Sequence, residues 1–281
     1  MSKPILCIPT YSRPDGICIR RCKNLPLKKF LFIRPEEKPL YSKWSQNYTL
    51  ILQEDGTDIG KVRRNIVNFC TDNSYDWVYM FDDDVQKIEL LGYDSEKERY
   101  NSSRIIEGRG DMPRVESEAL KLWYKLAKKY DLSLSSPNHR AYDRMHHGEL
   151  TLNRSTIIQC VLLHVPDIVS VGNYKSIRET GNEDYYIQYK LMSHKYNTGK
   201  IGLLEYDAPT LGSGKGGCNA SEILDLTERY TKFIDTFKSN VCENQELISV
   251  KTMKNGVSSL KFIWKGWEKY IDSGFFPLVN S

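Results

Sequence analysis

Residues 77–84 read WVYMFDDD, five apolar residues followed at once by three aspartates, here called the acidic triplet. The run Trp77–Phe81 is short and rich in aromatic and β-branched side chains, which favours a buried strand over a helix. Three adjacent carboxylates repel one another, which disfavours burying them together without a compensating cation. A solvated acidic turn is the alternative, but the acids begin where a strongly apolar strand ends. The stretch therefore predicts a strand that carries Asp82, Asp83 and Asp84 to the edge of a sheet.

Three earlier apolar runs predict further strands, namely Pro4–Pro9, Lys29–Ile33 and Tyr48–Gln53. The segment Lys61–Asn68 precedes the acidic triplet, and its apolar residues recur at helical spacing. Strands that alternate with helices predict right-handed βαβ units and a mostly parallel sheet. Open α/β folds bind their ligands beyond the carboxyl ends of such strands, which is where the three aspartates are expected.

The rest of the chain continues this alternation. The predicted elements are a helix over Glu116–Tyr130, a strand over Leu132–Leu134, an apolar run over Ile157–Val165, a helix over Glu183–Lys195 and a strand over Ile201–Leu204. The segment Leu91–Met112 is polar and contains glycines, which predicts a long loop. From Ala220 onward we expect a helical segment followed by a basic, aromatic tail.

Composition indicates a globular protein. With 281 residues, 40% of them hydrophobic and 27% charged, the chain can form one large domain or two closely packed ones. It contains no run of about 18 apolar residues, so neither a membrane-spanning helix nor a membrane partner is expected. The seven cysteines are odd in number and lack CxxC spacing, so we expect reduced thiols in a cytoplasmic protein. A net charge of +4 is compatible with an anionic substrate or with nucleic acid.

The segment Asp58–Asn65, DIGKVRRN, opens the predicted helix ahead of the acidic triplet. Asp58 is expected to be its N-cap, and a helix N-terminus beside basic residues suits an anion. Arg63 and Arg64 cannot both face the core, so at least one of them is expected to reach a diphosphate or a neighbouring acid. An exposed basic first turn is the alternative.

Two later segments carry further candidate residues. Glu183 and Asp184 begin a predicted helix, where acids are common for dipole reasons, but near a phosphate–metal site a carboxylate could serve as general base for a hydroxyl. Asp207 precedes the glycine-rich loop Gly212–Gly217, which contains Lys215. Such a loop either approaches phosphate oxygens closely or is a flexible connection. It is not a P-loop, because the GxxxxGK[ST] pattern is missing.

Taken in order, these features resemble the GT-A glycosyltransferases from about Pro4 to Gly217. The matching elements are Pro9-Thr10-Tyr11 with Arg13-Pro14, Arg64-Asn65 on a helix, the acidic triplet at the family's DxD position and Glu183-Asp184 at its late ED position. The resemblance implies an α/β GT-A fold, a Rossmann-like, mixed and mostly parallel sheet flanked by helices, with a helical C-terminal extension. It implies a nucleotide-sugar-binding half in residues 1–110, an acceptor-binding half in residues 111–219 and a helical, basic-aromatic region in residues 220–281.

The same resemblance implies a UDP-sugar donor, a Mg²⁺ or Mn²⁺ ion and a role for each matching residue. The implied donor-binding residues are Pro9, Thr10, Tyr11 and Arg13 at the uridine, Arg64 at the diphosphate or the acids, and Asp82, Asp83 and Lys215. The implied metal ligands are Asp82 and Asp84, with Asp207 in place of the histidine that the family often takes from a later loop. Asp184 would be the base beneath the acceptor hydroxyl with Glu183 beside it, which gives inversion at the anomeric carbon.

Within GT-A, the chain resembles the phage enzymes that glucosylate hydroxymethylated bases in DNA, of the type that adds a second glucose to glucosyl-hydroxymethylcytosine. This resemblance implies UDP-glucose as donor, double-stranded DNA as acceptor and the infected host cytoplasm as location. Candidate phosphate contacts are Lys121, Lys125, Lys128, Lys129, Arg140, Arg144 and the Lys/Trp tail, with ordinary solvated helix faces as the alternative. A glycan, lipopolysaccharide or protein acceptor, a nucleotidyltransferase and an inactive DNA-binding relative are the competing interpretations. The oligomeric state is left open.

Overall fold

The structure is a computed structural model, and it describes most of the chain up to residue 209. The described residues are 3–54, 57–90, 92–94, 99–101, 112–140, 150–153, 155–180, 182–209, 235, 248–252 and 258–262. Among them no helix combines the length and the apolar character that a bilayer crossing requires. The five cysteines within these ranges are all buried free thiols: Cys7, Cys18, Cys22, Cys70 and Cys160.

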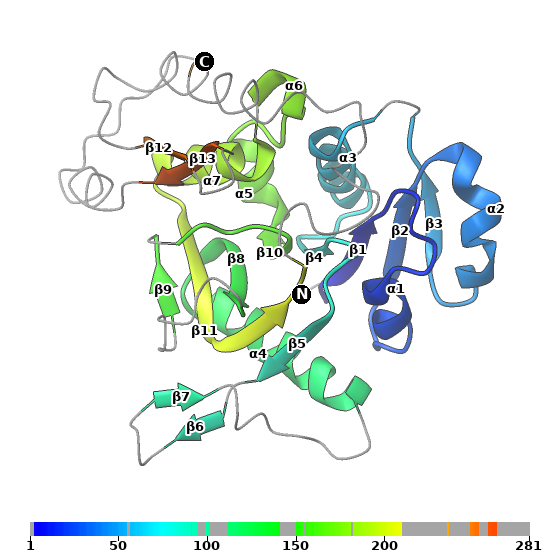
Figure 1. Cartoon of the computed structure of the whole chain (residues 1–281), viewed down its shortest axis with the longest axis horizontal. Coiled ribbons are helices and arrows are strands. Elements are labelled where there is room, and N and C mark those ends of the chain that lie inside the picture. Colours follow the sequence, from blue (N-terminus) through cyan, green and yellow to red (C-terminus); the bar gives the residue numbers. More distant parts are fainter. Residues whose placement is uncertain are drawn as a thin grey trace.

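Strands and helices alternate from β1 to β4, and beyond β4 the described chain contains runs of successive strands and one run of three helices (Figure 1). The strands are β1 (Ile5–Pro9), β2 (Lys29–Ile33), β3 (Thr49–Leu52), β4 (Trp77–Phe81), β5 (Lys87–Leu90), β6 (Gly92–Asp94), β7 (Arg99–Asn101), β8 (Leu132–His139), β9 (Leu150–Leu152), β10 (Cys160–His164), β11 (Asn197–Asp207), β12 (Ile248–Thr252) and β13 (Ser258–Phe262). The helices are α1 (Ile17–Cys22), α2 (Lys38–Tyr41), α3 (Ile59–Asp72), α4 (Met112–Lys129), α5 (Val165–Ser170), α6 (Ile177–Thr180) and α7 (Glu183–Ser193), with 3-10 turns η1 (Pro35–Glu37) and η2 (Ser42–Trp44).

One nine-stranded sheet organises the molecule, in the order β3-β2-β1-β4-β10-β8-β11-β5, with β9 paired to β11. Strands β3, β2, β1 and β4 are parallel, so their carboxyl ends meet at one edge. Strand β10 runs antiparallel to β4 on one side and to β8 on the other, and β8 and β11 are again parallel. The sheet is therefore mixed and mostly parallel, as the sequence predicts, and the acidic triplet directly follows β4 at the shared edge.

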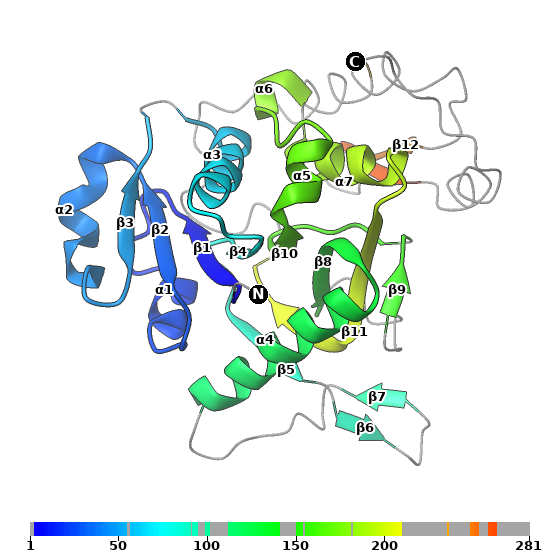
Figure 2. The same ribbon diagram turned by 180° about the vertical axis from the view of Figure 1, so that it is seen from behind.

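Helices cover both faces of the sheet, so its central strands are buried on both sides. On β1, Leu6 and Ile8 face a core cluster shared with α1 and α4, whereas Ile5 and Cys7 face a second cluster shared with α3, α5 and α7. Figure 2 shows α3, α5 and α7 on one side of the sheet and α1 and α4 on the other. Burial on both faces explains why these strands are continuous apolar runs in the sequence.

Two segments differ from the sequence prediction. The expected loop Leu91–Met112 contains the antiparallel pair β6–β7, and α4 begins at Met112 within it. In the tail that is expected to be helical, Ile248–Thr252 and Ser258–Phe262 pair instead as antiparallel strands. Apolar and polar residues alternate in Ile248–Thr252 (ISVKT), and this period of two is typical of a strand rather than a helix. The other residues of these two segments, apart from residue 235, lie outside the described part.

Candidate active site

The acidic triplet is bound to the end of β1 by two side chains. The Asp83 carboxylate accepts a hydrogen bond from Thr10 Oγ1 at 2.7 Å and one from Arg13 Nη1 at 2.7 Å. The same Arg13 nitrogen donates to Asp84 Oδ2 at 3.1 Å. Asp83 is buried, whereas the Asp84 side chain keeps 29% of its surface exposed. The ends of β1 and β4 are thus joined through charge-assisted hydrogen bonds.

The turn after β1 is shaped by residues that follow β2. Ser12 adopts a left-handed φ of 55°, and both its N–H and its hydroxyl donate to Glu37 Oε1, at 2.6 and 3.1 Å. The Tyr41 hydroxyl lies 2.8 Å from Thr10 Oγ1 and accepts from the Arg13 N–H at 3.1 Å. These contacts fix the turn that carries the predicted donor-binding residues.

The Tyr11 ring faces the neighbouring strand end. The Arg34 guanidinium lies over this ring, 3.7 Å from its centroid, and both side chains are partly exposed. Pro9 is buried at the end of β1. A partly exposed aromatic ring and cation at the carboxyl edge offer a stacking surface for a planar ring.

Helix α3 contributes one buried arginine to this edge. Arg63 Nη2 donates to both carboxylate oxygens of Asp82, at 3.0 and 3.3 Å, and its Nη1 pairs with Glu183 Oε1 at 3.3 Å and with Asp184 Oδ1. The prediction that at least one arginine of the pair reaches a neighbouring acid is confirmed. The arginine in contact with the acids is Arg63, so the diphosphate remains the proposed partner of Arg64. Arg64 lies 100° further round the helix, half-buried.

The first turn of α3 is bound tightly to the segment that leads into α7. Asp58 caps α3 by accepting from the Lys61 N–H at 3.0 Å, and it also accepts from the Ile177 N–H at 3.3 Å and from the Ser176 hydroxyl. A Cβ added to Gly60 would lie 2.2 Å from the Lys175 carbonyl oxygen. Only glycine allows this approach, which brings Arg63 within reach of α7.

Glu183 and Asp184 occupy the first turn of α7, capped by the Asn182 side chain. The Glu183 side chain is 6% exposed and that of Asp184 14%. Both acids therefore share one centre with the acidic triplet, although about 100 residues separate them in sequence. The order of the motifs in the sequence predicts that Glu183 and Asp184 lie close to Asp82.

Charge at this edge is unbalanced. Five carboxylates (Asp82, Asp83, Asp84, Glu183, Asp184) meet two guanidinium groups (Arg13, Arg63). Burial raises the pKa of Asp82 to about 7, against the opposing effect of Arg63, and burial also raises the pKa of Asp83. Burial works against the charge of Arg63 too, yet Asp82 and Glu183 raise its pKa overall, so it stays ionised. Excess negative charge in a poorly solvated place favours a bound cation.

Several buried polar atoms at this edge lack a hydrogen-bond partner among the described residues. They are Asp84 Oδ1, Glu183 Oε2, Arg63 Nε and Glu37 Oε2. Orphaned atoms of this kind are few in native proteins, and a strained geometry, a catalytic role, a bound water or a bound ion explains them. The unpartnered carboxylate oxygen of Asp84 is the kind of metal ligand that Mg²⁺ and Mn²⁺ prefer.

The third predicted metal ligand does not join the other two. Asp207 ends β11, where its carbonyl accepts from the Gln86 N–H at 2.7 Å, but its carboxylate lies 3.9 Å from Arg140. Within the described ranges no three His, Cys, Asp or Glu side chains are arranged so that together they could hold a metal ion. Arg140 is also paired with Glu205 at 3.3 Å and lies 3.7 Å from Glu89, and its side chain is 39% exposed.

Helix α4 packs along β4, and its lysine Lys128 lies near the start of that strand. Tyr124 packs edge-on against Trp77 at the start of β4, with ring centroids 5.4 Å apart, and Lys128 lies over Tyr124. Lys125, Lys128 and Lys129 are exposed. Lys121 is exposed and paired with Glu118 at 2.7 Å. Lys215, Arg144 and the Lys/Trp tail beyond Phe262 lie outside the described residues.

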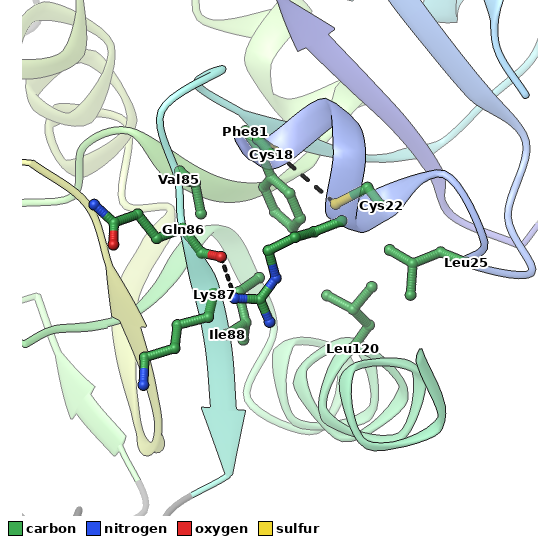
Figure 3. A pocket seen from close by; sticks show the side chains of 10 residues that line it. Cys18, Cys22, Leu25, Phe81, Val85, Gln86, Lys87, Ile88 and Leu120 are labelled. Atoms are coloured by element: carbon green, nitrogen blue, oxygen red, sulfur yellow. Dashed lines mark hydrogen bonds between the residues drawn. The ribbon is translucent and has the colours of Figure 1, made fainter. Parts of the chain in front are cut away.

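A small pocket lies behind the triplet, between α1, β5 and α4 (Figure 3). It is lined mainly by apolar side chains such as Cys18, Phe81 and Leu120, and Arg21 closes it by donating to the Gln86 carbonyl. Its volume of about 20 Å³ holds about one water molecule, so it is no nucleotide site.

Comparison with known proteins identifies the fold. No protein family's sequence profile matches the chain, and no curated protein matches it in sequence. The structure of GalNAc-T7 with UDP, GalNAc and Mn²⁺ superimposes with a TM-score of 0.53 at 9% identity, over 87% of this chain and 49% of that one. The fold is GT-A-like.

Two other solved structures resemble the chain less closely in shape. Staphylococcus aureus TarS 1–349 gives a TM-score of 0.48 at 11% identity, over 74% of this chain and 60% of that one. The 4-diphosphocytidyl-2C-methyl-D-erythritol synthase of Anaerococcus prevotii gives 0.43 at 9% identity, over 83% and 96%. The chain thus spans 60% of the length of the TarS fragment and 49% of the length of GalNAc-T7.

The sequence does not indicate Glu37, Tyr41 or Arg34, and the motif resemblance does not decide which of Arg63 and Arg64 contacts the acids. Arg63 could have been found, because it lies three residues before Ile66 and seven before Cys70, on the stripe of α3 that is buried. Glu37 and Tyr41 belong to short turns after β2, and no periodic pattern marks them.

Proposed function

We propose that the chain is a glycosyltransferase that moves a sugar from a UDP-sugar donor to an acceptor hydroxyl with the help of a divalent cation. The observation that carries the proposal is the cluster of five carboxylates and two arginines at the carboxyl edge of a GT-A-like sheet. Excess negative charge there suits a cation that bridges to phosphate oxygens. The TarS and GalNAc-T7 likenesses concern the fold, so the chemistry rests on these residues.

The donor would lie along the ends of β1 and β4. Tyr11 and Arg34 offer a surface for the uracil ring, while Pro9, Thr10 and Arg13 form the wall beside it. Asp83 is held by Thr10 and Arg13, so in this proposal its task is to position the donor-side loop rather than to bind a cation. Lys215 remains a candidate for the diphosphate.

The cation fits Asp84 and Asp82 best. Asp84 has an unpartnered buried oxygen, and Asp82 carries a carboxylate that its surroundings solvate poorly. When bound, Mg²⁺ or Mn²⁺ would neutralise the charge that builds on the departing diphosphate. Asp207 stays the weakest of the proposed ligands, because its carboxylate lies nearer Arg140.

Asp184 is the proposed base. It lies in the first turn of α7, across Arg63 from Asp82, and its side chain remains 14% exposed. It would take the proton from the acceptor hydroxyl as that oxygen attacks the anomeric carbon, so the product has inverted configuration. Buried Glu183 would add negative charge beside the cationic sugar of the transition state.

Two acceptor classes remain in the proposal. The first is a hydroxyl of hydroxymethylcytosine or glucosyl-hydroxymethylcytosine in double-stranded DNA, with UDP-glucose as donor. The second is a hydroxyl of a glycan, lipopolysaccharide or protein. Lys128 lies over Tyr124, which packs on Trp77 at the start of β4, and Lys121 is paired with Glu118, so these lysines give the DNA acceptor no particular support.

A transfer assay tests the proposal. Radiolabelled UDP-glucose and Mn²⁺ are incubated with the protein and with plain DNA, hydroxymethylcytosine DNA, glucosylated DNA or a glycan panel. We expect label in one acceptor, loss of at least about 100-fold in Asp84→Ala, and a similar loss in Asp184→Asn with UDP binding nearly unchanged. Asp15→Asn, an exposed change on the same half of the chain, is the matched control.

Each outcome discriminates. Near-normal turnover in Asp184→Asn would remove that residue from the role of base. Metal-dependent UDP release without label in any DNA would direct the search to glycans. If UDP-sugars are neither bound nor cleaved, the proposed reaction class is wrong.

A further inference from the structure

Arg63 contacts both the acidic triplet and the acids of α7. We propose that it is a positioning residue: one guanidinium holds the carboxylate of Asp184 in place and competes with the divalent cation for Asp82. The inference rests on the proposed function for the role of Asp184, whereas the competition for Asp82 can be measured without it.

The geometry ties two distant parts of the chain through one planar group. Arg63 Nη2 bonds both oxygens of Asp82, and Nη1 bonds Glu183 and Asp184. The guanidinium offers its donors in a rigid fork, so these acids are held at a fixed separation. A lysine ammonium is a point charge on a flexible stem and cannot span them in the same way.

Burial indicates that the charge serves more than packing. The Arg63 side chain is 5% exposed, and its Nε has no partner among the described residues. Taking an ion out of water is costly, and buried ion pairs often stabilise a fold no better than apolar side chains of similar size. A buried arginine with one nitrogen left unpaired is therefore poorly explained by stability alone.

Arg63 competes with the divalent cation because its guanidinium is bound to Asp82. Asp82 lies two residues before Asp84, the acid with the unpartnered oxygen, so a cation held by the two would lie close to the Arg63 guanidinium. The cation and the guanidinium repel each other in this partly buried place, and the repulsion lowers the affinity for the cation by more than about tenfold. The arginine thus weakens cation binding while it orders Asp184.

Arg13 binds the other two acids of the triplet, because its Nη1 donates to both Asp83 and Asp84. Helix α3 places Arg63 between Asp82 and the acids of α7, because Gly60 and Asp58 fasten the first turn of α3 to the residues before α7.

The test measures two quantities on the full chain. Calorimetric titration with Mn²⁺ alone gives cation affinity, and UDP-sugar incubation gives the ratio of transfer to hydrolysis. Arg63→Gln should bind Mn²⁺ at least about tenfold more tightly, because a competing charge is gone. Arg63→Lys keeps the charge, so its Mn²⁺ affinity should stay within about threefold, while its transfer-to-hydrolysis ratio falls at least about tenfold. Arg178→Gln, an exposed change on neighbouring α6, should move neither quantity more than about twofold.

Unchanged or weaker Mn²⁺ binding in Arg63→Gln would overturn the competition. An unchanged transfer-to-hydrolysis ratio in Arg63→Lys would overturn the positioning role. Circular dichroism and melting curves identify a variant that fails to fold, and if Arg63→Gln does so, Arg63→Lys still decides the positioning role. If the wild type releases no UDP at all, the proposed function fails, and the Mn²⁺ titrations still decide whether Arg63 opposes the cation.

Discussion

Replacing Asp82 by Asn should stabilise the protein above neutral pH in the absence of metal. Burial of the Asp82 carboxylate raises its pKa to about 7, and the negative charges of Asp84 and Asp83 add to this effect. In the unfolded chain an aspartate has a pKa of about 3.9, so folding costs free energy whenever this group is ionised. Asn keeps an oxygen that can accept from Arg63 and carries no charge.

The magnitude follows from the two pKa values. A difference of about 3 units corresponds to at most about 4 kcal/mol. Because the side chain is 24% exposed and the Arg63 ion pair is lost, we expect a gain of about 2 kcal/mol at pH 8. For a chain of this size that raises Tm by about 4–8 °C.

The sign also fixes the pH dependence. Between pH 4 and 7 the native state binds a proton at Asp82 that the unfolded state releases, so wild-type stability falls as pH rises through this window. The gain in Asp82→Asn should therefore be largest at pH 8 and nearly vanish by pH 4. Urea denaturation in EDTA at several pH values measures it, with exposed Asp15→Asn as control. A variant no more stable than wild type at pH 8, or a gain that does not vary with pH, would refute the reasoning.

Three other changes probe the scaffold of the site. Gly60→Ala places a Cβ 2.2 Å from the Lys175 carbonyl oxygen, so it should destabilise by about 2–3 kcal/mol despite the better helix propensity, as urea denaturation will measure. Asp58→Ala removes the cap of α3 and the bonds to Ser176 and its neighbour, which should cost about 2 kcal/mol in the same assay; a loss under about 0.5 kcal/mol would contradict this. Tyr41→Phe removes a hydroxyl bonded at the β1 turn and should cost about 1 kcal/mol and weaken UDP binding severalfold in calorimetry. Because burial raises the Tyr41 pKa to about 12, its effect should not change between pH 6 and 9.

Much of the sheet could be predicted from the sequence, because its inner strands are buried on both faces. Lys29–Ile33 and Trp77–Phe81 have the same bounds in the sequence prediction and in the structure. Strands β5 and β9 went unpredicted, since they are short and only partly buried and so leave no continuous apolar run. The sequence predicts only Leu132–Leu134 of the eight-residue strand β8, because serines, a proline and an asparagine interrupt its apolar pattern.

The candidate site was predictable only in part. A run of acids after an apolar strand identified Asp82–Asp84, and their place at the sheet edge follows from the parallel topology. Which of two adjacent arginines faces them depends on the phase of α3, and the motif resemblance does not report that phase. Contacts such as Glu37 with Ser12 depend on a 3-10 turn and a left-handed residue, which neighbouring side chains select and sequence periodicity does not report.

The strand order also bears on how the chain reaches this state. The four parallel strands β3-β2-β1-β4 are complete by residue 81, so they can pair while the remaining chain is still being synthesised. Until β10 is made and pairs Met80 with Val161, however, the apolar strand β4 has no partner on one side. An unpaired apolar edge recruits other chains, so fragments that end before residue 160 should aggregate although they contain every residue of the acidic triplet. Separate production of residues 1–110 is therefore expected to fail, because β10 is needed to cover the free edge of β4.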